Sequence, residues 1–438
     1  MLMGYHEKGE TFTEDFPENE KSREAKSKFE AMVKKNGSLI LPPEITRQSG
    51  LAPGAKVDIV PENDHVIIHP NIHSLARVYI EPTSVCNLTC QTCIRNTWTE
   101  PLGYMEMGTF SRIVEQLKKF PHLQSVMFGG FGEPTAHKEI LSMIRSVKSL
   151  GVKAEMVTNG TLLDEKMIQG LHDVRLDTLW ISFDGADGAS FEDIRKGASF
   201  RQVIGGLELL QKVTKKSRHK IDLGIAFVVM RKNIEHLKNL DRLIWATGAR
   251  MVSVSNVLPY TEEMESQMVC SHALTLETLA DVDGRVDVSL PRLDVTDATK
   301  DAFLSLFRGY YNLSIMGNKI STETQQCRFI KDRCTFIRWD GKVSPCMGLL
   351  HSHTAFLYGL PRTIDSYILG DVDSGNLFEI WNSTEYKEFR EKVRAFEFSP
   401  CHLCGGCDYI EKNREDCFGN TFPACGGCLW AQGIIQCP

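Results

Sequence analysis

Three cysteines near the start of the chain have a spacing that suits a metal cluster. Cys86, Cys90 and Cys93 form a C-x3-C-x2-C pattern directly after an apolar stretch that predicts a strand. Three thiolates on one short loop can ligate three irons of a [4Fe-4S] cluster, which leaves the fourth iron without a protein ligand. An open metal position is a reaction position, as in catalytic metal sites. A structural zinc site or a chance trio stays the alternative.

A glycine-rich loop follows the next predicted strand. Residues 129–134 read GGFGEP and include Gly130, Phe131, Gly132 and Glu133. Glycine lets a ligand approach the backbone closely, and a carboxylate such as Glu133 can accept a hydrogen bond from an ammonium group. Because this loop stands after the second strand of a series that opens with the cysteine pattern, it indicates a cofactor site.

A second group of cysteines fills the last quarter of the chain. Cys270 stands alone, and we expect it to be a buried apolar residue. The other ten are Cys327, Cys334, Cys346, Cys401, Cys404, Cys407, Cys417, Cys425, Cys428 and Cys437. Such a cysteine-rich segment needs metal to fold, and paired zinc ribbons are one form that its C-x2-C units could take.

The residues between the two cysteine groups alternate between apolar runs and amphipathic stretches. Strands are predicted at 77–81, 125–129, 153–157, 178–183, 224–229 and 251–254, and helices at 110–120, 138–150, 164–171, 200–213 and 234–247. This order predicts an α/β fold with parallel strands covered by helices. Six βα repeats are two short of a complete eight-fold barrel, so we expect a partial, open (βα)6 barrel.

The repeats divide the chain into five predicted segments. Residues 1–30 form a polar lead-in, and residues 31–72 form a small β module with turn signals. The barrel covers residues 76–265, a helical connector covers 266–326, and the cysteine-rich domain covers 327–438.

Composition excludes several classes of protein. The 438 residues include 42% hydrophobic residues and carry a net charge of −6, which fits a globular chain without a strongly basic nucleic-acid surface. No apolar run approaches the roughly 20 residues of a membrane span, and the acidic amino terminus does not resemble a secretory signal. We therefore expect a cytoplasmic protein with reduced thiols.

Together, the cysteine pattern and the glycine loop resemble the radical SAM enzymes over roughly residues 76–260. The resemblance implies that the triad binds a [4Fe-4S] cluster whose open iron is chelated by S-adenosylmethionine, and that an electron from a donor such as ferredoxin or flavodoxin then gives a 5′-deoxyadenosyl radical. It also implies an anaerobic setting. The cofactor-binding residues that it implies are Gly130, Phe131, Gly132, Glu133, Thr158, Asn159, Ser182, Asp184 and Arg195. Thr92 departs from the family, which usually has an aromatic residue before the third cysteine.

The cysteine-rich segment resembles the SPASM extension of radical SAM enzymes, which holds two auxiliary [4Fe-4S] clusters. By that pattern Cys327, Cys334 and Cys346 bind one cluster together with a later cysteine, and the second cluster draws on residues 401–437. Ten cysteines exceed the eight that two clusters need, so two are spare, and Cys437 is either a ligand or one of these two.

Three further groups have both a functional and a structural interpretation. Arg195 and Lys196 would meet a substrate carboxylate or phosphate, or they form a solvated helix end. His351 and His353 would face the substrate, or they are structural. Residues 33–70 resemble the SpoVT-AbrB swapped-hairpin family, whose members often bind DNA as dimers. Since residues 1–70 hold 9 basic and 12 acidic residues, we expect dimerisation or partner docking rather than DNA binding.

Longer strings, among them CNLTCQTCIRNTW and CGGCLWAQGIIQCP, resemble the radical SAM maturases associated with tungsten-dependent aldehyde ferredoxin oxidoreductases. This resemblance implies a role in building a tungsten–pterin oxidoreductase or its cofactor. The alternative is a SPASM enzyme that oxidises or cross-links a precursor peptide, and a third hypothesis is an iron–sulfur redox sensor that binds DNA.

Overall fold

The computed structural model describes residues 32–48, 57–62, 65–215, 217–269, 286–290, 311–315, 318–319, 327–357, 359–399 and 408–438. The chain divides into two compact units, residues 1–70 and 71–438, which we describe separately. The predicted lead-in at residues 1–30 lies outside the described residues, as do Cys270, Cys401, Cys404 and Cys407.

The first unit contains a short helix and a β-hairpin. Helix α1 covers Pro43–Gln48, and strands β1 (Val57–Glu62) and β2 (His65–Pro70) pair antiparallel, with Asp58 opposite His69. The hairpin agrees with the β content predicted for the small module at residues 31–72. Its membership of the swapped-hairpin family stays a prediction.

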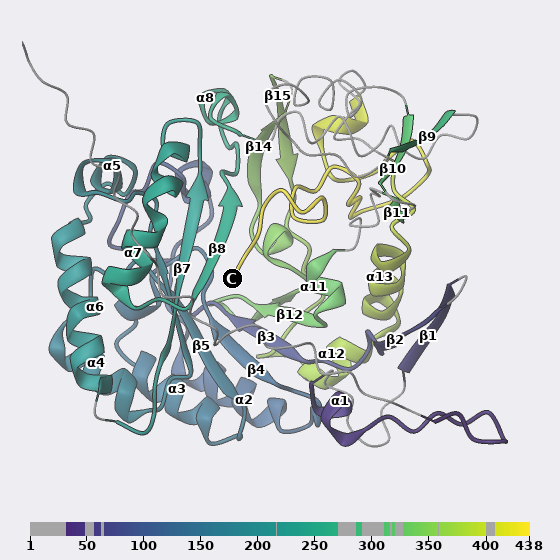
Figure 1. Cartoon of the computed structure of the whole chain (residues 1–438), viewed down its shortest axis with the longest axis horizontal. Helices are drawn as coiled ribbons and strands as arrows, with labels where there is room; N and C mark the ends of the chain where they lie inside the picture. The colour runs from purple at the N-terminus through teal and green to yellow at the C-terminus, as the bar shows by residue number, and fades with distance from the viewer. Residues whose placement is uncertain are drawn as a thin grey trace, which may run out of the picture. The chain divides into compact units, whose positions relative to one another are not determined.

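The second unit is built on a parallel sheet (Figure 1). Strands β3 (Arg77–Ile80), β4 (Ser125–Phe128), β5 (Lys153–Thr158), β6 (Thr178–Ser182), β7 (Asp222–Val229) and β8 (Met251–Asn256) pair in chain order, each parallel to the next. The predicted series of six parallel strands is confirmed.

Helices cover the outer face of these strands, as Figure 1 shows. They are α2 (Met107–Leu117), α3 (Ile140–Lys148), α4 (Glu165–Asp173), α5 (Gly188–Ile194), α6 (Phe200–Lys215) and α7 (Leu240–Thr247). Helix α3, for example, buries Ile140, Met143, Ile144 and Val147 at helical spacing, which forms an apolar stripe. Asp164 caps α4 by accepting a hydrogen bond from the Met167 N–H, which fixes where the helix begins.

The cysteine-rich segment continues the same sheet. Strand β12 (Cys334–Ile337) pairs parallel with β3, and β13 (Lys342–Ser344) and β16 (Gly370–Asp371) extend the sheet antiparallel to nine strands. The segment therefore shares a sheet with the barrel rather than standing apart from it.

Shorter elements complete the second half of the chain. These are helices α8 (Glu262–Ser266), α11 (Arg328–Lys331), α12 (Leu377–Asn382) and α13 (Thr384–Ala395). Strands β14 (His353–Leu357) and β15 (Leu360–Ile364) pair as an antiparallel hairpin, and β14 contacts α8. Single 3-10 turns cover Ile94–Thr97, Pro134–Ala136, Ile234–Asn239, Met347–Leu349 and Asp408–Glu411.

The predicted helical connector at 266–326 is described only at residues 266–269, 286–290, 311–315 and 318–319. The last three ranges are strands rather than helices, and they form a three-stranded sheet of β9 (Val286–Leu290), β10 (Tyr311–Ile315) and β11 (Asn318–Lys319). The physical reason is visible in the sequence, because VDVSL and YNLSI both alternate apolar and polar residues, which is the period of a strand.

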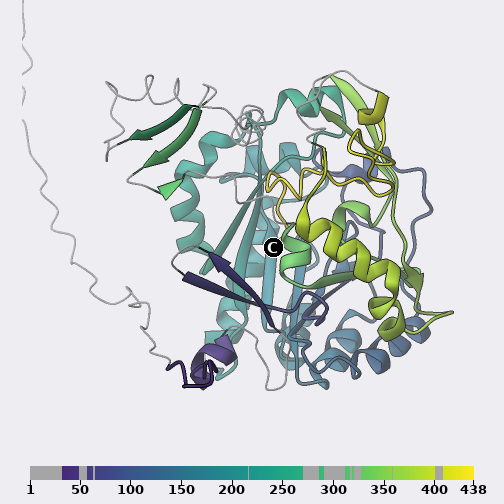
Figure 2. The ribbon, with the colours of Figure 1, turned by 90° about the vertical axis from the view of Figure 1, so that its right-hand side faces the viewer.

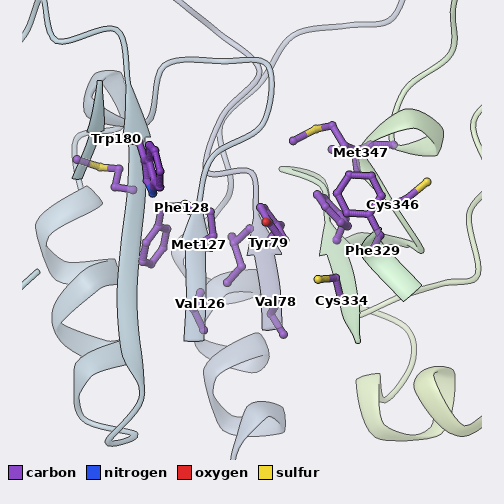
Figure 3. Close-up of a cluster of buried hydrophobic side chains, with 14 of the residues drawn as sticks. Val78, Tyr79, Val126, Met127, Phe128, Trp180, Phe329, Cys334, Cys346 and Met347 are labelled. Atoms are coloured by element: carbon purple, nitrogen blue, oxygen red, sulfur yellow. The ribbon is translucent and has the colours of Figure 1, made fainter. Parts of the chain in front are cut away.

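One hydrophobic core runs from the barrel into the cysteine-rich segment. Figure 3 shows Val78, Tyr79, Val126, Met127 and Phe128 of the central strands beside Phe329, Cys334 and Met347 of the later segment. The rings of Tyr79 and Phe336 stack with their centroids 4.3 Å apart across the β3–β12 pair. Strands buried on both faces read as near-continuous apolar runs, which is why the sequence predicted them well.

Candidate active site at the carboxyl ends of the strands

A large cavity of the second unit opens where the parallel strands end. It encloses about 1360 Å³, part of which is open to solvent, and its walls include Gly130 after β4, Thr158 in β5, Ser182 in β6 and Val228 in β7. Loops at the carboxyl ends of parallel strands form the active sites of α/β barrels. The cavity is therefore in the position expected of a catalytic site.

All three cysteines of the triad line this cavity. They lie on the loop after β3, and hydrogen-bond donors surround their sulfur atoms: the Leu88 N–H donates to Cys86 at 3.4 Å, and Arg95 Nε donates to Cys93 at 3.4 Å. Burial raises the pKa of Cys86 and raises that of Cys90 to about 11. These thiols become thiolates when a metal binds them, and N–H donors to sulfur are the usual surroundings of cluster ligands.

Two glycines of the GGFGEP loop, Gly130 and Gly132, are required by packing. Gly130 has a φ of +124°, and a Cβ there would stand 2.6 Å from Cγ of Glu81. A Cβ on Gly132 would stand 2.0 Å from the carbonyl oxygen of Thr83. The loop therefore lies directly against the segment that leads from β3 into the triad, which brings the two predicted cofactor loops together.

Glu133 joins the loops that follow β4 and β5. Its side chain is 2% exposed, Oε1 accepts hydrogen bonds from the Thr135 N–H and from Thr158 Oγ1, and Oε2 accepts one from the Asn159 N–H at 2.7 Å. Asn159 in turn donates to Asn87 Oδ1 at 3.0 Å, within the triad loop. A carboxylate oxygen can accept two hydrogen bonds, so Oε2 can receive one more donor from a ligand in the cavity.

Arg195 and Asp184 form a buried ion pair at the other side of the cavity. Asp184 is fully buried, and its Oδ2 lies 2.9 Å from Arg195 Nη2. Arg195 is 8% exposed and lines the cavity, and its Nε has no hydrogen-bond acceptor among the described residues. The alternative of a solvated helix end is therefore wrong for Arg195, whereas Lys196 is exposed and pairs with Asp193.

This set of residues fits the [4Fe-4S] cluster and the S-adenosylmethionine that the resemblance implies. A buried guanidinium with a free N–H suits a carboxylate, the open acceptor position of Glu133 suits an ammonium, and three thiolates suit a cluster with one open iron. Thr92 lines the cavity in place of the family's aromatic residue, and Phe131 adds an aromatic ring to the wall.

A second cavity lies among the later cysteines, with about 750 Å³ of empty space, part of which is open to solvent. Four thiols line it, those of Cys327, Cys346, Cys425 and Cys428, and most of the remaining wall is apolar. Burial raises the pKa of all four thiols, to about 12 for Cys327. Among the described residues no three His, Cys, Asp or Glu side chains converge closely enough to ligate a single metal ion. The four thiols surround a volume instead, which suits a cluster.

The remaining described cysteines do not line the second cavity. Cys334 on β12 is buried and points away from Cys346 in Figure 3, and Cys417 is exposed. Cys437 lines the first cavity with the triad. Its segment crosses from β8 to β3, because the Gln436 N–H donates to Ser255 Oγ at 2.9 Å and Tyr79 Oη donates to the Pro438 carbonyl at 3.0 Å. Figures 1 and 2 both place this end of the chain near the middle of the second unit.

The two predicted histidines lie in different places. His353 lines the second cavity, and His351 lines neither cavity but is buried between Glu81 and Glu100. Sequence reasoning missed both of these glutamates. The only signal was the position of Glu81, a charged residue directly at the end of an apolar strand.

Family comparisons agree with this geometry. Residues 80–244 match the radical SAM superfamily, and residues 327–408 match the SPASM domain, an iron–sulfur cluster-binding domain. Among the described residues, none of the helices has the length and apolar character needed to cross a bilayer.

Among characterised proteins, the chain is 30% identical over 377 residues to the tungsten-containing aldehyde ferredoxin oxidoreductase cofactor-modifying protein of Pyrococcus furiosus, covering 82% of this chain and 96% of that protein. It is 27% identical over 343 residues to the PqqA peptide cyclase of Rhodopseudomonas palustris, covering 75% and 81%. The structure of Streptococcus suis SuiB bound to its precursor peptide SuiA superposes with a TM-score of 0.51 at 18% identity, covering 77% of this chain and 72% of that one, which shows a shared fold.

Proposed function

We propose that this chain reductively cleaves S-adenosylmethionine and acts in the maturation of a tungsten–pterin aldehyde ferredoxin oxidoreductase or of its cofactor. The chain belongs to the family of the tungsten-containing aldehyde ferredoxin oxidoreductase cofactor-modifying protein, and it has a radical SAM domain and a SPASM domain. The observation that carries the proposal is the cavity that brings the triad, the GGFGEP loop and Arg195 together.

The triad supplies the three thiolates, and the cavity holds the nucleoside. Cys86, Cys90 and Cys93 would hold a [4Fe-4S] cluster, and the chemistry that it would supply is one-electron reduction of S-adenosylmethionine, which splits into methionine and the 5′-deoxyadenosyl radical. Arg195 pairs with the carboxylate of the methionine moiety through its free Nε, and Glu133 accepts from the ammonium group. Thr158, Asn159 and Ser182 lie at the strand ends around them.

Asp184 keeps Arg195 in place. Burial raises the pKa of Asp184, and the Arg195 charge and the hydrogen bond from the Val228 N–H oppose this shift. Because the pair is buried, separating the two side chains would be costly, so we infer that Asp184 holds Arg195 in the cavity wall.

The substrate assignment rests on the length of the match. The similarity covers 96% of the Pyrococcus furiosus protein, so it includes the cysteine-rich half as well as the barrel. Auxiliary clusters in that half would exchange electrons with the substrate or with a donor such as ferredoxin or flavodoxin.

The test of this assignment compares two substrate classes. Anaerobic protein is incubated with reductant, S-adenosylmethionine and either a co-produced tungsten–pterin oxidoreductase or a set of precursor peptides, and mass spectrometry follows 5′-deoxyadenosine and the mass of each candidate substrate. We expect substrate-dependent 5′-deoxyadenosine and a gain of tungsten–pterin content or activity in the oxidoreductase. A mass change in a peptide alone would contradict the assignment.

Peptide modification is the second candidate. The PqqA peptide cyclase of Rhodopseudomonas palustris favours it, because that relative matches over 343 residues that span both halves of the second unit. The third hypothesis, a DNA-binding redox sensor, gives no role to a cavity of about 1360 Å³ beside the triad, part of which is open to solvent, and this argues against it.

We infer that the first unit forms a homodimer contact. Five of its apolar side chains are each more than half exposed: Met32, Val33, Ile40, Ile59 and Val66. We expect the protein to be a dimer in light scattering, and the double variant Ile59→Ser/Val66→Ser to be a monomer that cleaves S-adenosylmethionine at the parent rate. A parent that is monomeric at micromolar concentration would contradict this.

A further inference from the structure

A buried histidine from the cysteine-rich segment lies between two glutamates of the barrel. His351 Nε2 lies 2.9 Å from Glu81 Oε2, and His351 Nδ1 lies 2.9 Å from Glu100 Oε2. The His351 side chain is 1% exposed. Both ring nitrogens can donate at once only when the imidazole is protonated, so the arrangement is that of a positively charged histidine between two carboxylates.

Glu81 also contacts the cofactor loop, which is the GGFGEP loop. Its other oxygen, Oε1, accepts a hydrogen bond at 3.1 Å from the Phe131 N–H, which is the centre of GGFGEP. The carboxylate reaches that N–H because Gly130 has no side chain: a Cβ there would stand 2.8 Å from Glu81 Oε1. Glu81 is thus held at one end by His351 and holds the loop at the other.

On the opposite side of the imidazole, Glu100 is held by two further hydrogen bonds. Glu100 also accepts hydrogen bonds from Arg338 Nη1 at 3.0 Å and from the Ser352 N–H at 3.1 Å. The His351 ring stacks on Trp98, with ring centroids 4.1 Å apart, and its edge meets the Phe131 ring at 6.0 Å. Trp98 follows the triad by five residues, so His351 contacts both of the loops that form the cofactor site.

The charges around the ring favour the protonated form. Burial lowers the pKa of His351, but the hydrogen bonds to Glu100 and Glu81 raise it by more, so the pKa is above its ordinary value. Arg338 opposes this weakly, and Asp340 pairs with Arg338 at the far side. The neighbouring His353 has a pKa lowered by burial, so it is neutral and adds no competing charge at neutral pH.

We propose that His351 is a positioning residue that fixes the Phe131 loop in the conformation that binds S-adenosylmethionine. This inference rests on the proposed function. Loss of the imidazolium removes a charged hydrogen-bond donor from buried Glu81, which is a costly change in a dry site. The carboxylate and the Phe131 N–H that depends on it are then free to move, and the loop no longer matches the cofactor.

The test is binding of S-adenosylmethionine, without reductant, to anaerobically reconstituted protein of measured iron content. We expect His351→Gln to weaken binding roughly tenfold, the effect of losing one hydrogen bond to a charged group, and to keep the iron content of the parent. His219→Gln is the matched control, because it alters a half-buried histidine whose Nε2 lies 2.9 Å from the Leu176 carbonyl oxygen. His219 touches neither glutamate and lines neither cavity, so this variant should bind as the parent does.

The pH profile separates positioning from general support of the fold. Because the pKa of His351 is raised, the parent should bind fully below about pH 6.5 and lose affinity as the pH rises through the raised pKa. His351→Gln should show no such loss, and Glu100→Gln should shift the loss to lower pH, since it removes one of the two carboxylates. The difference between parent and variant profiles cancels the titration of all other groups.

Each outcome decides between the alternatives. Parent-like affinity of His351→Gln at every pH would overturn the positioning role, as would parent and Glu100→Gln profiles that coincide. If His351→Gln fails to fold, the comparison of parent with Glu100→Gln still decides. Absence of any S-adenosylmethionine binding by the parent would instead contradict the proposed function.

Discussion

Replacing any one of Cys86, Cys90 and Cys93 by alanine is expected to abolish formation of 5′-deoxyadenosine and to remove about four irons per chain. All three thiols line one cavity, and no fourth described cysteine of the triad loop is present to substitute for a lost one. A cluster with fewer than three protein ligands is not held, so the loss should be complete rather than partial.

Iron analysis and chromatography of the reaction mixture with S-adenosylmethionine and reductant check this result. The matched control is Cys270→Ala, which changes a cysteine that belongs to neither group in the sequence, and we expect it to keep both iron and activity. Normal 5′-deoxyadenosine formation by a variant that lacks all three cysteines would contradict the assignment of the triad.

The parallel strands could be predicted from the sequence because burial on both faces leaves a plain signal. β4 and β6 read SVMF and TLWIS, and all of their residues but Ser182 are buried. Amphipathic helices between such runs leave few alternatives to a parallel α/β fold. The triad could be predicted for a similar reason, since its three members lie within eight residues and need no long-range contact to come together.

The partner of β12 could not be predicted in the same way. CTFI is a short apolar run that would suit any sheet edge, and its pairing with β3 joins residues more than 250 positions apart. Side-chain pattern sets which face of a strand is buried but does not choose its neighbour. The sequence therefore indicated a separate cysteine-rich domain where the structure has one continuous sheet.

The contacts of His351 could not be predicted from the sequence for the same reason. Glu81, Glu100 and His351 are each common residue types, and nothing in their local sequence marks them as partners. The glycines of GGFGEP also have a second explanation that only the structure gives, since Gly130 and Gly132 leave room for Glu81 and for the Thr83 carbonyl.

The later cysteines that share a cavity differ from those that the family pattern groups as ligands of one cluster. The family pattern grouped Cys334 with Cys327 and Cys346, whereas the wall of the second cavity contains Cys327 and Cys346 together with Cys425 and Cys428. The last two belong to a C-x2-C pair, and the Cys428 N–H donates to the Cys425 carbonyl at 3.0 Å, which turns both side chains to one side. We propose that these four thiols bind one auxiliary cluster.

Replacing any one of these four cysteines by serine is expected to lower the iron content from on the order of twelve to about eight per chain and to make residues 408–438 sensitive to protease. The second cavity lies inside the core that Leu429, Trp430 and Phe389 share with the barrel. Without the cluster, this region would hold an unfilled volume lined by four thiols, so metal binding and folding are coupled there. The triad cluster is bound by a separate loop, and its spectral change with S-adenosylmethionine should survive.

Two matched variants make the assignment specific. Cys334→Ala removes a buried thiol from β12, and Cys437→Ser alters a thiol in the wall of the first cavity; both should keep about twelve irons and resist protease as the parent does. Cys437→Ser should instead change turnover, because the thiol lies in the cavity with the triad. Loss of about four irons in Cys437→Ser, with no loss in Cys425→Ser, would place the ligand at the end of the segment that crosses from β8 to β3. Stoichiometric zinc with only about four irons in the parent would favour paired zinc ribbons, and the four thiols would then bind zinc rather than an electron carrier.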